Sequence, residues 1–475
     1  MGKLTVSEIL EATGGVLVSG KAEAEITGIE TDSRKAGEGS LFVPVIGERV
    51  DGHRFIPQAF KAGAAAALSS EKIAPDLIKE HPEKSLIQVE DTVQALQAIG
   101  AYCRSRLSIP VIGVTGSVGK TTAREMIACA LTGGFEKVFK TAGNHNSQVG
   151  VPITLFEIQP DDEIAVLELG MSEPGEMERI ASTARVDMAA VTNIGIAHIG
   201  QLGSQENICR EKLKIQEGMR EGGILFLNGD DPILKNQKAR EGLKTIYFGT
   251  GENCQYRAVD IGAEEGFPVF TAHCPDGAKT QVRLGVLGSH NILNGILSIA
   301  VACENGVKPA DAAKALQSFA GYKGRQQIFE TGTITVIDDS YNASPVSMKG
   351  GLEVLMKIHP GKRKIAVLAD MKELGEKEAL YHREVGTYIG EHFSHHMADQ
   401  LFLLGELAEE IGKGVIATAP EAETAIHLFQ DKEELETELK KSLQPQDCVL
   451  FKGSNCMGLG DIASRFAAEG LKKAE

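Results

Sequence analysis

The chain has 475 residues, of which 42% are hydrophobic and 24% charged, and this size predicts about three globular domains rather than a single core. Its formal net charge of −16 argues against a general nucleic-acid-binding protein, because phosphate backbones require a positive protein face. No apolar run approaches the roughly 20 residues of a membrane span, and the N-terminus lacks the apolar stretch of a secretion signal, so we expect a cytoplasmic protein without membrane insertion. The eight cysteines contain no Cys-x-x-Cys pair, so we expect neither a disulfide framework nor a zinc site.

The first part of the chain, residues 1–108, is predicted to be a small α/β domain. Short alternating segments are separated by turn-forming clusters such as Gly37–Ser40, and Thr92–Arg106 has the pattern of a helix.

The second part, residues 109–322, alternates apolar strands with helix patterns, which predicts a parallel sheet covered by helices on both faces. Shorter alternating runs near its end suggest a local antiparallel patch, followed by a helix over Asn291–Glu304. The expected parallel strands are Val111–Thr115, Ile164–Leu169, Met188–Thr192 and Gly223–Leu227, and the antiparallel ones are Tyr256–Val259, Pro268–Ala272 and Thr280–Leu284.

The third part, residues 323–475, shows the same alternation and predicts a second, doubly wound (Rossmann-like) sheet. The whole chain is therefore assigned to the α/β class with three domains. The expected strands of this part are Ile334–Asp338, Ile365–Ala369, Gln400–Leu404 and Cys448–Phe451, and the expected helices are Pro345–Ile358, Ala379–Phe393, Pro420–Gln430 and Lys432–Leu443.

The most informative motif is the run Gly113–Thr122, which stands between the apolar stretch 109–112 and a helix pattern over Arg124–Leu131. A glycine-rich turn between a strand and a helix is the layout of a phosphate-binding loop, in which a lysine reaches the terminal phosphates and a Ser/Thr hydroxyl holds Mg²⁺. Val114 stands where the strict pattern has glycine, so the loop is a variant. We expect a nucleotide triphosphate to contact Gly116, Ser117, Val118, Gly119, Lys120, Thr121 and Thr122.

Several polar residues follow predicted strands, where ligands of open parallel sheets bind. Glu168, at the end of such a strand, could bind magnesium. Alternatively, it caps a helix or is a surface carboxylate. Taken alone, His198 is more often structural, and Lys212 belongs by composition to the exposed face of a helix.

A further group lies at the start of the third part. Asp338 and Asp339 could bind metal or ribose hydroxyls, or simply stabilise a turn. Asn342 on the next turn could read a base edge. Arg325, at the junction of the second and third parts, could swing onto a terminal phosphate when the domains close, although most lone arginines are surface charges.

Together these residues make the chain resemble the Mur ligase family over nearly its full length, and within it the members that add D-alanyl-D-alanine. In the family plan the first domain holds the UDP-sugar, the central one binds ATP and the third closes over both. The resemblance rests on eight motifs in order, which are Thr31–Arg34, Asp51–His53, Thr115–Thr121, Gly143–Asn146, Thr192–His198, His290–Asn291, Asp338–Asn342 and Met371–Gly375.

The resemblance implies a role for each matched site residue. Glu168 and His198 would ligate magnesium, and Lys212 would be carbamylated by CO₂, which replaces an ammonium with a carbamate that carries oxygen ligands. Asn291 and Asp339 would contact the adenine and ribose of the nucleotide, and Arg325 its γ-phosphate. The sugar nucleotide would be contacted by Ser33, Arg34, Asp51, Gly52 and His53. Asn144 and Asn146 would lie near the peptide.

The implied reaction uses ATP, with two Mg²⁺ ions, to activate the carboxylate of UDP-N-acetylmuramoyl-tripeptide as an acyl phosphate, which the amine of D-alanyl-D-alanine then attacks. The product would be the pentapeptide precursor of peptidoglycan. Lys120 and Arg325, with magnesium, would neutralise the charge on the transferring oxygens. The carboxylate-histidine-lysine group of Glu168, His198 and Lys212 would hold the metal.

Two positions depart from the pattern of these members. Ser147 replaces an asparagine near the peptide, and Asn455 stands where arginine is common, so the dipeptide specificity stays open. Three alternatives remain. They are a family member that adds one diamino acid, a folylpolyglutamate-type ligase, and a nucleotide-gated ATPase without a second substrate. The third residue of the tripeptide, lysine or diaminopimelate, also stays open, and a monomer is expected.

Overall fold

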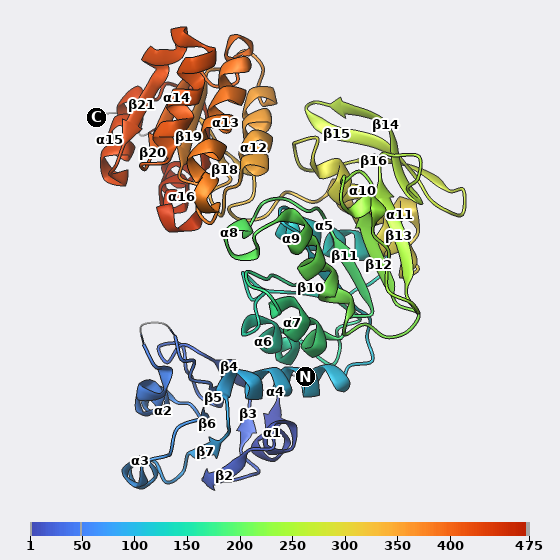
Figure 1. The fold of residues 1–475 in the computed structure, drawn as a ribbon, viewed down its shortest axis with the longest axis vertical. Coiled ribbons are helices and arrows are strands. Elements are labelled where there is room, and N and C mark those ends of the chain that lie inside the picture. Colours follow the sequence, from blue (N-terminus) through green and yellow to red (C-terminus); the bar gives the residue numbers. More distant parts are fainter. Residues whose placement is uncertain (1, 48–49, 472–475) are drawn as a thin grey trace.

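The structure is a computed structural model that describes residues 2–47 and 50–471. Figure 1 shows three lobes in chain order, with the N-terminal lobe in blue, the central lobe from cyan to yellow and the C-terminal lobe in orange and red. Each lobe is built on its own main sheet, and helices cover these sheets. The predicted α/β class with three domains is confirmed.

The N-terminal lobe has a five-stranded sheet in the order β2-β7-β6-β5-β4, in which only β2 is antiparallel to its neighbour, and a separate pair β1-β3. Its elements are β1 (Leu4–Thr5), α1 (Val6–Thr13), β2 (Val16–Ser19), β3 (Glu25–Ile26), β4 (Gly28–Glu30), β5 (Ser40–Phe42), the 3₁₀ helix η1 (Gly52–Phe55), α2 (Ile56–Ala62), β6 (Ala66–Ser69), α3 (Pro75–Glu80), β7 (Ser85–Gln88) and α4 (Thr92–Ser105).

The central lobe has a nine-stranded sheet in the order β16-β15-β14-β13-β12-β11-β8-β10-β9. The strands from β9 to β14 are parallel, and β15 and β16 add the predicted antiparallel patch at one edge. Its strands are β8 (Val111–Thr115), β9 (Val138–Lys140), β10 (Ile164–Glu168), β11 (Met188–Val191), β12 (Ile224–Asn228), β13 (Lys244–Gly249), β14 (Tyr256–Glu264), β15 (Phe267–His273) and β16 (Lys279–Arg283). Its helices are α5 (Lys120–Leu131), α6 (Gly150–Glu157), α7 (Glu176–Ala184), α8 (Ile199–Leu202), α9 (Gln205–Leu213), η2 (Lys214–Gln216), η3 (Leu234–Asn236), α10 (Asn291–Glu304) and α11 (Pro309–Gln317).

The C-terminal lobe has a six-stranded sheet in the order β17-β18-β22-β19-β20-β21, parallel except for the edge strand β17. Its strands are β17 (Gln327–Glu330), β18 (Thr335–Asp338), β19 (Lys364–Ala369), β20 (Gln400–Leu404), β21 (Ile426–Phe429) and β22 (Cys448–Lys452). Its helices are α12 (Pro345–Lys357), η4 (Gly375–Lys377), α13 (Glu378–Glu391), η5 (Phe393–His395), α14 (Ala408–Thr418), η6 (Pro420–Ala425), α15 (Lys432–Ser442), η7 (Asn455–Met457) and α16 (Leu459–Glu469).

Strand alternation divides the central core into two layers. Val111 and Leu167 face the layer of α6, α7 and α9, whereas Ile112 and Val166 face the layer of α5, α10 and α11. The N-terminal core joins the first layer through α4, which packs on α6 and α7. The N-terminal lobe is therefore fixed to the central lobe by a continuous hydrophobic core.

An ion pair with a buried arginine fixes the same junction. Arg104, which is 1% exposed, donates from Nη2 to Asp187 Oδ2 at 2.8 Å, and Asp187 also accepts from the Val111 amide at 2.9 Å. The guanidinium further donates to the carbonyls of Ala184 and Arg185. The end of α4 is thereby tied to the start of β8, the strand that leads into the phosphate loop.

One predicted helix is wrong. The range 420–430 forms the short 3₁₀ helix η6 and then the edge strand β21, which pairs with β20. The helices α14 and α16 were not predicted. Among the described residues, no helix combines the length and apolarity that a bilayer crossing requires.

Candidate active site

The predicted phosphate loop lies between β8 and α5, as expected. Gly119 caps α5 with φ +82°, a conformation that favours glycine. Gly116 is needed for a different reason, because a Cβ at this position would lie 1.9 Å from Thr192 Oγ1. The strand, turn and helix arrangement is therefore confirmed, and both glycines have a structural reason.

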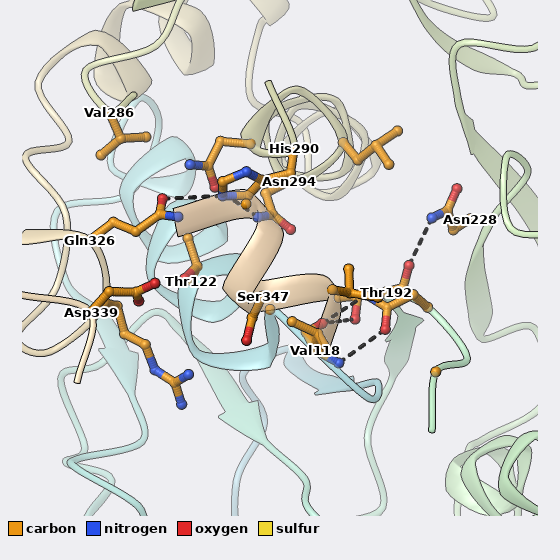
Figure 2. A pocket seen from close by; sticks show the side chains of 18 of the residues that line it. Val118, Thr122, Thr192, Asn228, Val286, His290, Asn294, Gln326, Asp339 and Ser347 are labelled. Carbon is orange, nitrogen blue, oxygen red and sulfur yellow. Dashed lines mark hydrogen bonds between the residues drawn. The ribbon is translucent and has the colours of Figure 1, made fainter. Parts of the chain in front are cut away.

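The end of β11 braces this loop, a feature that the sequence did not reveal. The Ser117 and Val118 amides donate to Asn193 O and Oδ1 at 3.1 and 3.0 Å, and Thr192 Oγ1 donates to Val118 O at 2.8 Å (Figure 2). Two loop amides are thus occupied by protein. The N–H groups of Gly119 and of the first turn of α5 remain suited to phosphate, because the start of an α-helix has no internal acceptors for them.

Replacing Gly116 tests this packing. Gly116→Ala should lower kcat/KM for ATP by about 10²-fold, because the new methyl group must displace Thr192 and with it the loop. The measurement is steady-state kinetics. Gly306→Ala is the control, since Gly306 also has positive φ but has open space around it. Equal activity of the two variants would show that the approach of Gly116 to Thr192 is unimportant.

Three cationic or hydroxyl side chains meet at the loop. Lys120 Nζ donates to Gly116 O at 2.9 Å, and burial lowers the pKa of Lys120. Arg325 comes from the junction between the central and C-terminal lobes, and its Nη2 lies 3.5 Å from Thr121 Oγ1. Its guanidinium stacks 4.2 Å above the ring of Tyr341. The structure therefore places the junction arginine beside the lysine and threonine of the loop.

Glu168 ends β10 at the same edge of the sheet and is 3% exposed. Arg124 Nη1 donates to its Oε2 at 3.2 Å and Asn146 Nδ2 donates to its Oε1 at 2.8 Å. Each carboxylate oxygen keeps a lone pair beyond these bonds. The bonds orient a buried carboxylate near Lys120, whose ammonium it attracts.

Lys212 differs most from the expectation drawn from composition alone. It is fully buried rather than exposed, and its Nζ has no hydrogen-bond partner within the described chain. Burial, followed by repulsion from Lys120, lowers the pKa of Lys212 well below its usual value. A neutral amine is the form that reacts with CO₂, so the surroundings of Lys212 fit the carbamate that the resemblance implies.

A small cavity of about 80 Å³ lies between the loop and the C-terminal lobe. His198 enters it from the central lobe, and Asn342 and Glu373 enter it from the C-terminal lobe. Asn342 thus lies at the Lys120 end of the site. The Ser117 hydroxyl in this cavity is buried and has no hydrogen-bond partner among the residues that the structure describes.

A larger cavity of about 360 Å³ adjoins the loop on its other side, and Val286, Asn294 and Thr192 line it (Figure 2). Its wall is mainly apolar and is formed by residues of the central and C-terminal lobes, which is typical of a site for a small organic ligand. His290 and Gln326 meet across it with 3.1 Å between Nε2 and Oε1. Neither residue had been assigned a role from the sequence.

Asn291 and Asp339, the predicted nucleotide contacts, both line this larger cavity, as does Thr122. The side-chain Nδ2 of Asn291 donates to Leu287 O at 2.7 Å, and the Asn291 Oδ1 accepts from Asn294 Nδ2 at 3.0 Å. Asp339 Oδ2 accepts from Lys452 at 2.6 Å. Lys452 is 1% exposed and stands at the end of β22, a position that could have drawn attention to it in the sequence.

The residues predicted to contact the sugar nucleotide lie in the N-terminal lobe. Asp51 Oδ1 accepts from the amide of His53 and lies 2.6 Å from His53 Nδ1, whereas His53 Nε2 accepts from the Ser70 amide at 3.0 Å. His53 therefore has both ring nitrogens engaged within the protein.

The other residues of this group differ in exposure, and Ser33 is as buried as His53. Arg34 is largely exposed and pairs with Asp32 at 2.7 Å, and Ser33 Oγ lies 3.3 Å from Gln58 Oε1. Gly52 fits closely against the Val45 backbone. Asn144 is exposed, while Asn146 reaches Glu168.

Three family profiles match successive parts of the chain: the Mur ligase family catalytic domain over residues 25–103, the Mur ligase middle domain over 114–302, and the Mur ligase glutamate ligase domain over 324–455. The UDP-N-acetylmuramoyl-tripeptide–D-alanyl-D-alanine ligase of Bacillus subtilis is 37% identical over 97% of this chain and 98% of its own length. The enzyme of that name from Escherichia coli is 31% identical over 99% of this chain and all of its own length.

Solved structures agree. A crystal structure of MurF from Acinetobacter baumannii has a TM-score of 0.86 and 30% identity, covering 98% of this chain and 99% of that one. A MurF ligase from Thermotoga maritima in complex with ADP has a TM-score of 0.78 and 29% identity, covering 93% and 97%. The chain belongs to the Mur ligase family.

Proposed function

We propose that the chain is an ATP-dependent carboxylate–amine ligase that joins D-alanyl-D-alanine to UDP-N-acetylmuramoyl-tripeptide and so makes the pentapeptide precursor of peptidoglycan. The observation that carries this proposal is the pair of adjoining cavities at the phosphate loop, which are lined from two lobes. The two relatives described above bear the name of this activity and span nearly the whole chain.

ATP would lie along the loop with its base in the larger cavity. The apolar wall suits a purine, and Asn291 and Asp339, which line this cavity, would contact the base and the ribose. The phosphates would then reach Gly119, Lys120 and Thr121 at the first turn of α5. The ADP complex of the Thermotoga maritima relative supports a nucleotide in this fold.

Thr121, Glu168, His198 and a carbamylated Lys212 would hold two Mg²⁺ ions. Oxygen ligands suit this ion, and Glu168 supplies a carboxylate that is already oriented. The amine of Lys212, which is buried and has no hydrogen-bond partner in the described part of the chain, supports the carbamate. When bound, the ions would supply positive charge to the β- and γ-phosphate oxygens.

The reaction follows from these placements. The terminal carboxylate of the tripeptide attacks the γ-phosphorus, the bond to the ADP oxygen breaks, and an acyl phosphate forms. The amine of D-alanyl-D-alanine then adds to the acyl carbon, and phosphate leaves. Lys120 and Arg325, which both contact the loop, would stabilise the negative charge on the transferring group, so no protein nucleophile is required.

The remaining substrate contacts are assigned by lobe. Ser33, Arg34 and the Asp51–His53 turn would hold the sugar nucleotide, and Asn144 and Asn146 would lie near the peptide. The three domains would span residues 1–108, 109–322 and 323–475. A monomer is part of the proposal, and the eight free cysteines support a cytoplasmic location.

The proposal is tested by the mass of the product. Incubation with ATP, Mg²⁺, D-alanyl-D-alanine and the lysine or diaminopimelate form of the tripeptide should yield the pentapeptide, with phosphate release that depends on both co-substrates. A product extended by a single amino acid would favour the single-residue ligases. Phosphate release with ATP alone would favour the ATPase.

A further inference from the structure

The segment Met371–Gly375 follows β19 and has no role in the reaction described above, although it reaches the phosphate site. Glu373 and Gly375 have φ +66° and +67°, and the Glu373 side chain lines the small cavity beside the loop. A non-glycine residue in this conformation costs free energy and often marks a functional site.

Glu373 meets His198 across the boundary between the lobes. Its Oε2 lies 3.0 Å from His198 Nδ1, and the imidazole side chain is 19% exposed. The two atoms are close but are not aligned as a hydrogen bond. Such a contact can tighten when ligands bind.

The backbones beside this pair are also in contact. Helix α8, which follows His198, packs on η4, and a Cβ on Gly375 would lie 3.3 Å from the Cα of Gly200. The two glycines thus let the lobes approach closely enough for His198 and Glu373 to meet. Ile196, just before, packs against the C-terminal core.

We propose that Glu373 is a positioning residue that holds the His198 ring through Nδ1, so that Nε2 faces the magnesium site. A carboxylate on the second ring nitrogen is the usual partner of a metal-binding histidine. Because Glu373 belongs to the C-terminal lobe, the metal site is complete only when that lobe is docked. This inference rests on the proposed function, in which His198 is a metal ligand.

The test measures metal binding without turnover, by calorimetric titration of Mg²⁺ into the full chain with a non-hydrolysable ATP analogue. Glu373→Ala should raise the Kd for Mg²⁺ about tenfold, whereas Glu373→Gln, which keeps an acceptor oxygen, should stay within about threefold of wild type. Glu376→Ala is the matched control, because Glu376 is an exposed glutamate on η4. Binding of the analogue without metal should not change.

A double-variant cycle separates positioning from a general structural effect. In a His198→Ala background, Glu373→Ala should cause less than about a twofold further loss of metal affinity. An equal loss in both backgrounds, an unchanged Kd in Glu373→Ala, or a Glu373→Gln variant as weak as Glu373→Ala would each overturn the inference. If the wild-type chain itself binds no magnesium with the analogue, the proposed function fails instead.

The glycine contact gives a second, independent variant. Gly375→Ala should weaken magnesium binding as Glu373→Ala does, because the methyl group pushes η4 away from Gly200. Gly361→Ala carries the same positive-φ strain but meets nothing within 4 Å. Equal magnesium affinity of these two glycine variants would contradict the docking part of the inference.

Discussion

Lys120→Ala should reduce kcat by about 10³-fold or more while leaving the fold intact. The Lys120 ammonium lies at the first turn of α5, with Glu168, Arg325 and Glu373 among its charged neighbours. In the proposed function it neutralises charge on the γ-phosphoryl group. Burial disfavours the charged form of Lys120 and lowers its pKa, so we expect its removal not to lower the free energy of unfolding.

The measurement for this variant is phosphate release under saturating substrates, with thermal unfolding as the check on the fold. Lys140→Ala is a suitable control, because Lys140 is an exposed lysine on β9 that pairs with Glu125. Near-normal turnover of the Lys120 variant would refute the assignment of the loop.

Lys212→Ala should lower kcat by about 10²-fold or more, and added formate or acetate should restore part of the activity. The variant lacks the amine that CO₂ would carbamylate, and a small carboxylate can occupy the space and offer oxygen to magnesium. If Lys212 had no role at the metal, its replacement should leave kcat unchanged and leave the free energy of unfolding unchanged or higher, because its buried amine has no hydrogen-bond partner among the described residues.

The control for this variant is Lys214→Ala, two residues along, where the ammonium is partly exposed and pairs with Glu211 at 3.1 Å and Glu178 at 3.4 Å. It should keep wild-type kcat and be insensitive to formate. Full activity of Lys212→Ala, or an inactive variant that no carboxylate rescues, would count against the carbamate.

The sequence predicted the elements whose signal is local. The strands Val111–Thr115 and Gln400–Leu404 and the helix Asn291–Glu304 are found with those bounds, because continuous apolar runs and a long apolar periodicity mark them clearly. The range 420–430 failed because Pro420 and the helix-forming alanines and glutamates favour a helix. Its strand exists only by pairing with β20, which is a tertiary effect.

The site shows the same division. The loop could be predicted because its glycines, lysine and threonine are contiguous. Whether Lys212 is buried depends on how α9 packs, and the contact of Arg325 with Thr121 joins residues 204 positions apart. The contacts of Asn193 with Val118, of Lys452 with Asp339 and of Glu373 with His198 are of the same long-range kind, and only the structure shows them.

The central claim is that the phosphate loop binds ATP and that the γ-phosphoryl group is transferred from it to a carboxylate. This claim is tested most directly by isotope transfer. UDP-N-acetylmuramoyl-tripeptide labelled with ¹⁸O in its terminal carboxylate is turned over with ATP, Mg²⁺ and D-alanyl-D-alanine, and the released phosphate is analysed by mass spectrometry. An acyl phosphate requires one carboxylate oxygen to leave with the phosphate, so labelled phosphate should form in step with product. Product formation with unlabelled phosphate would contradict the account.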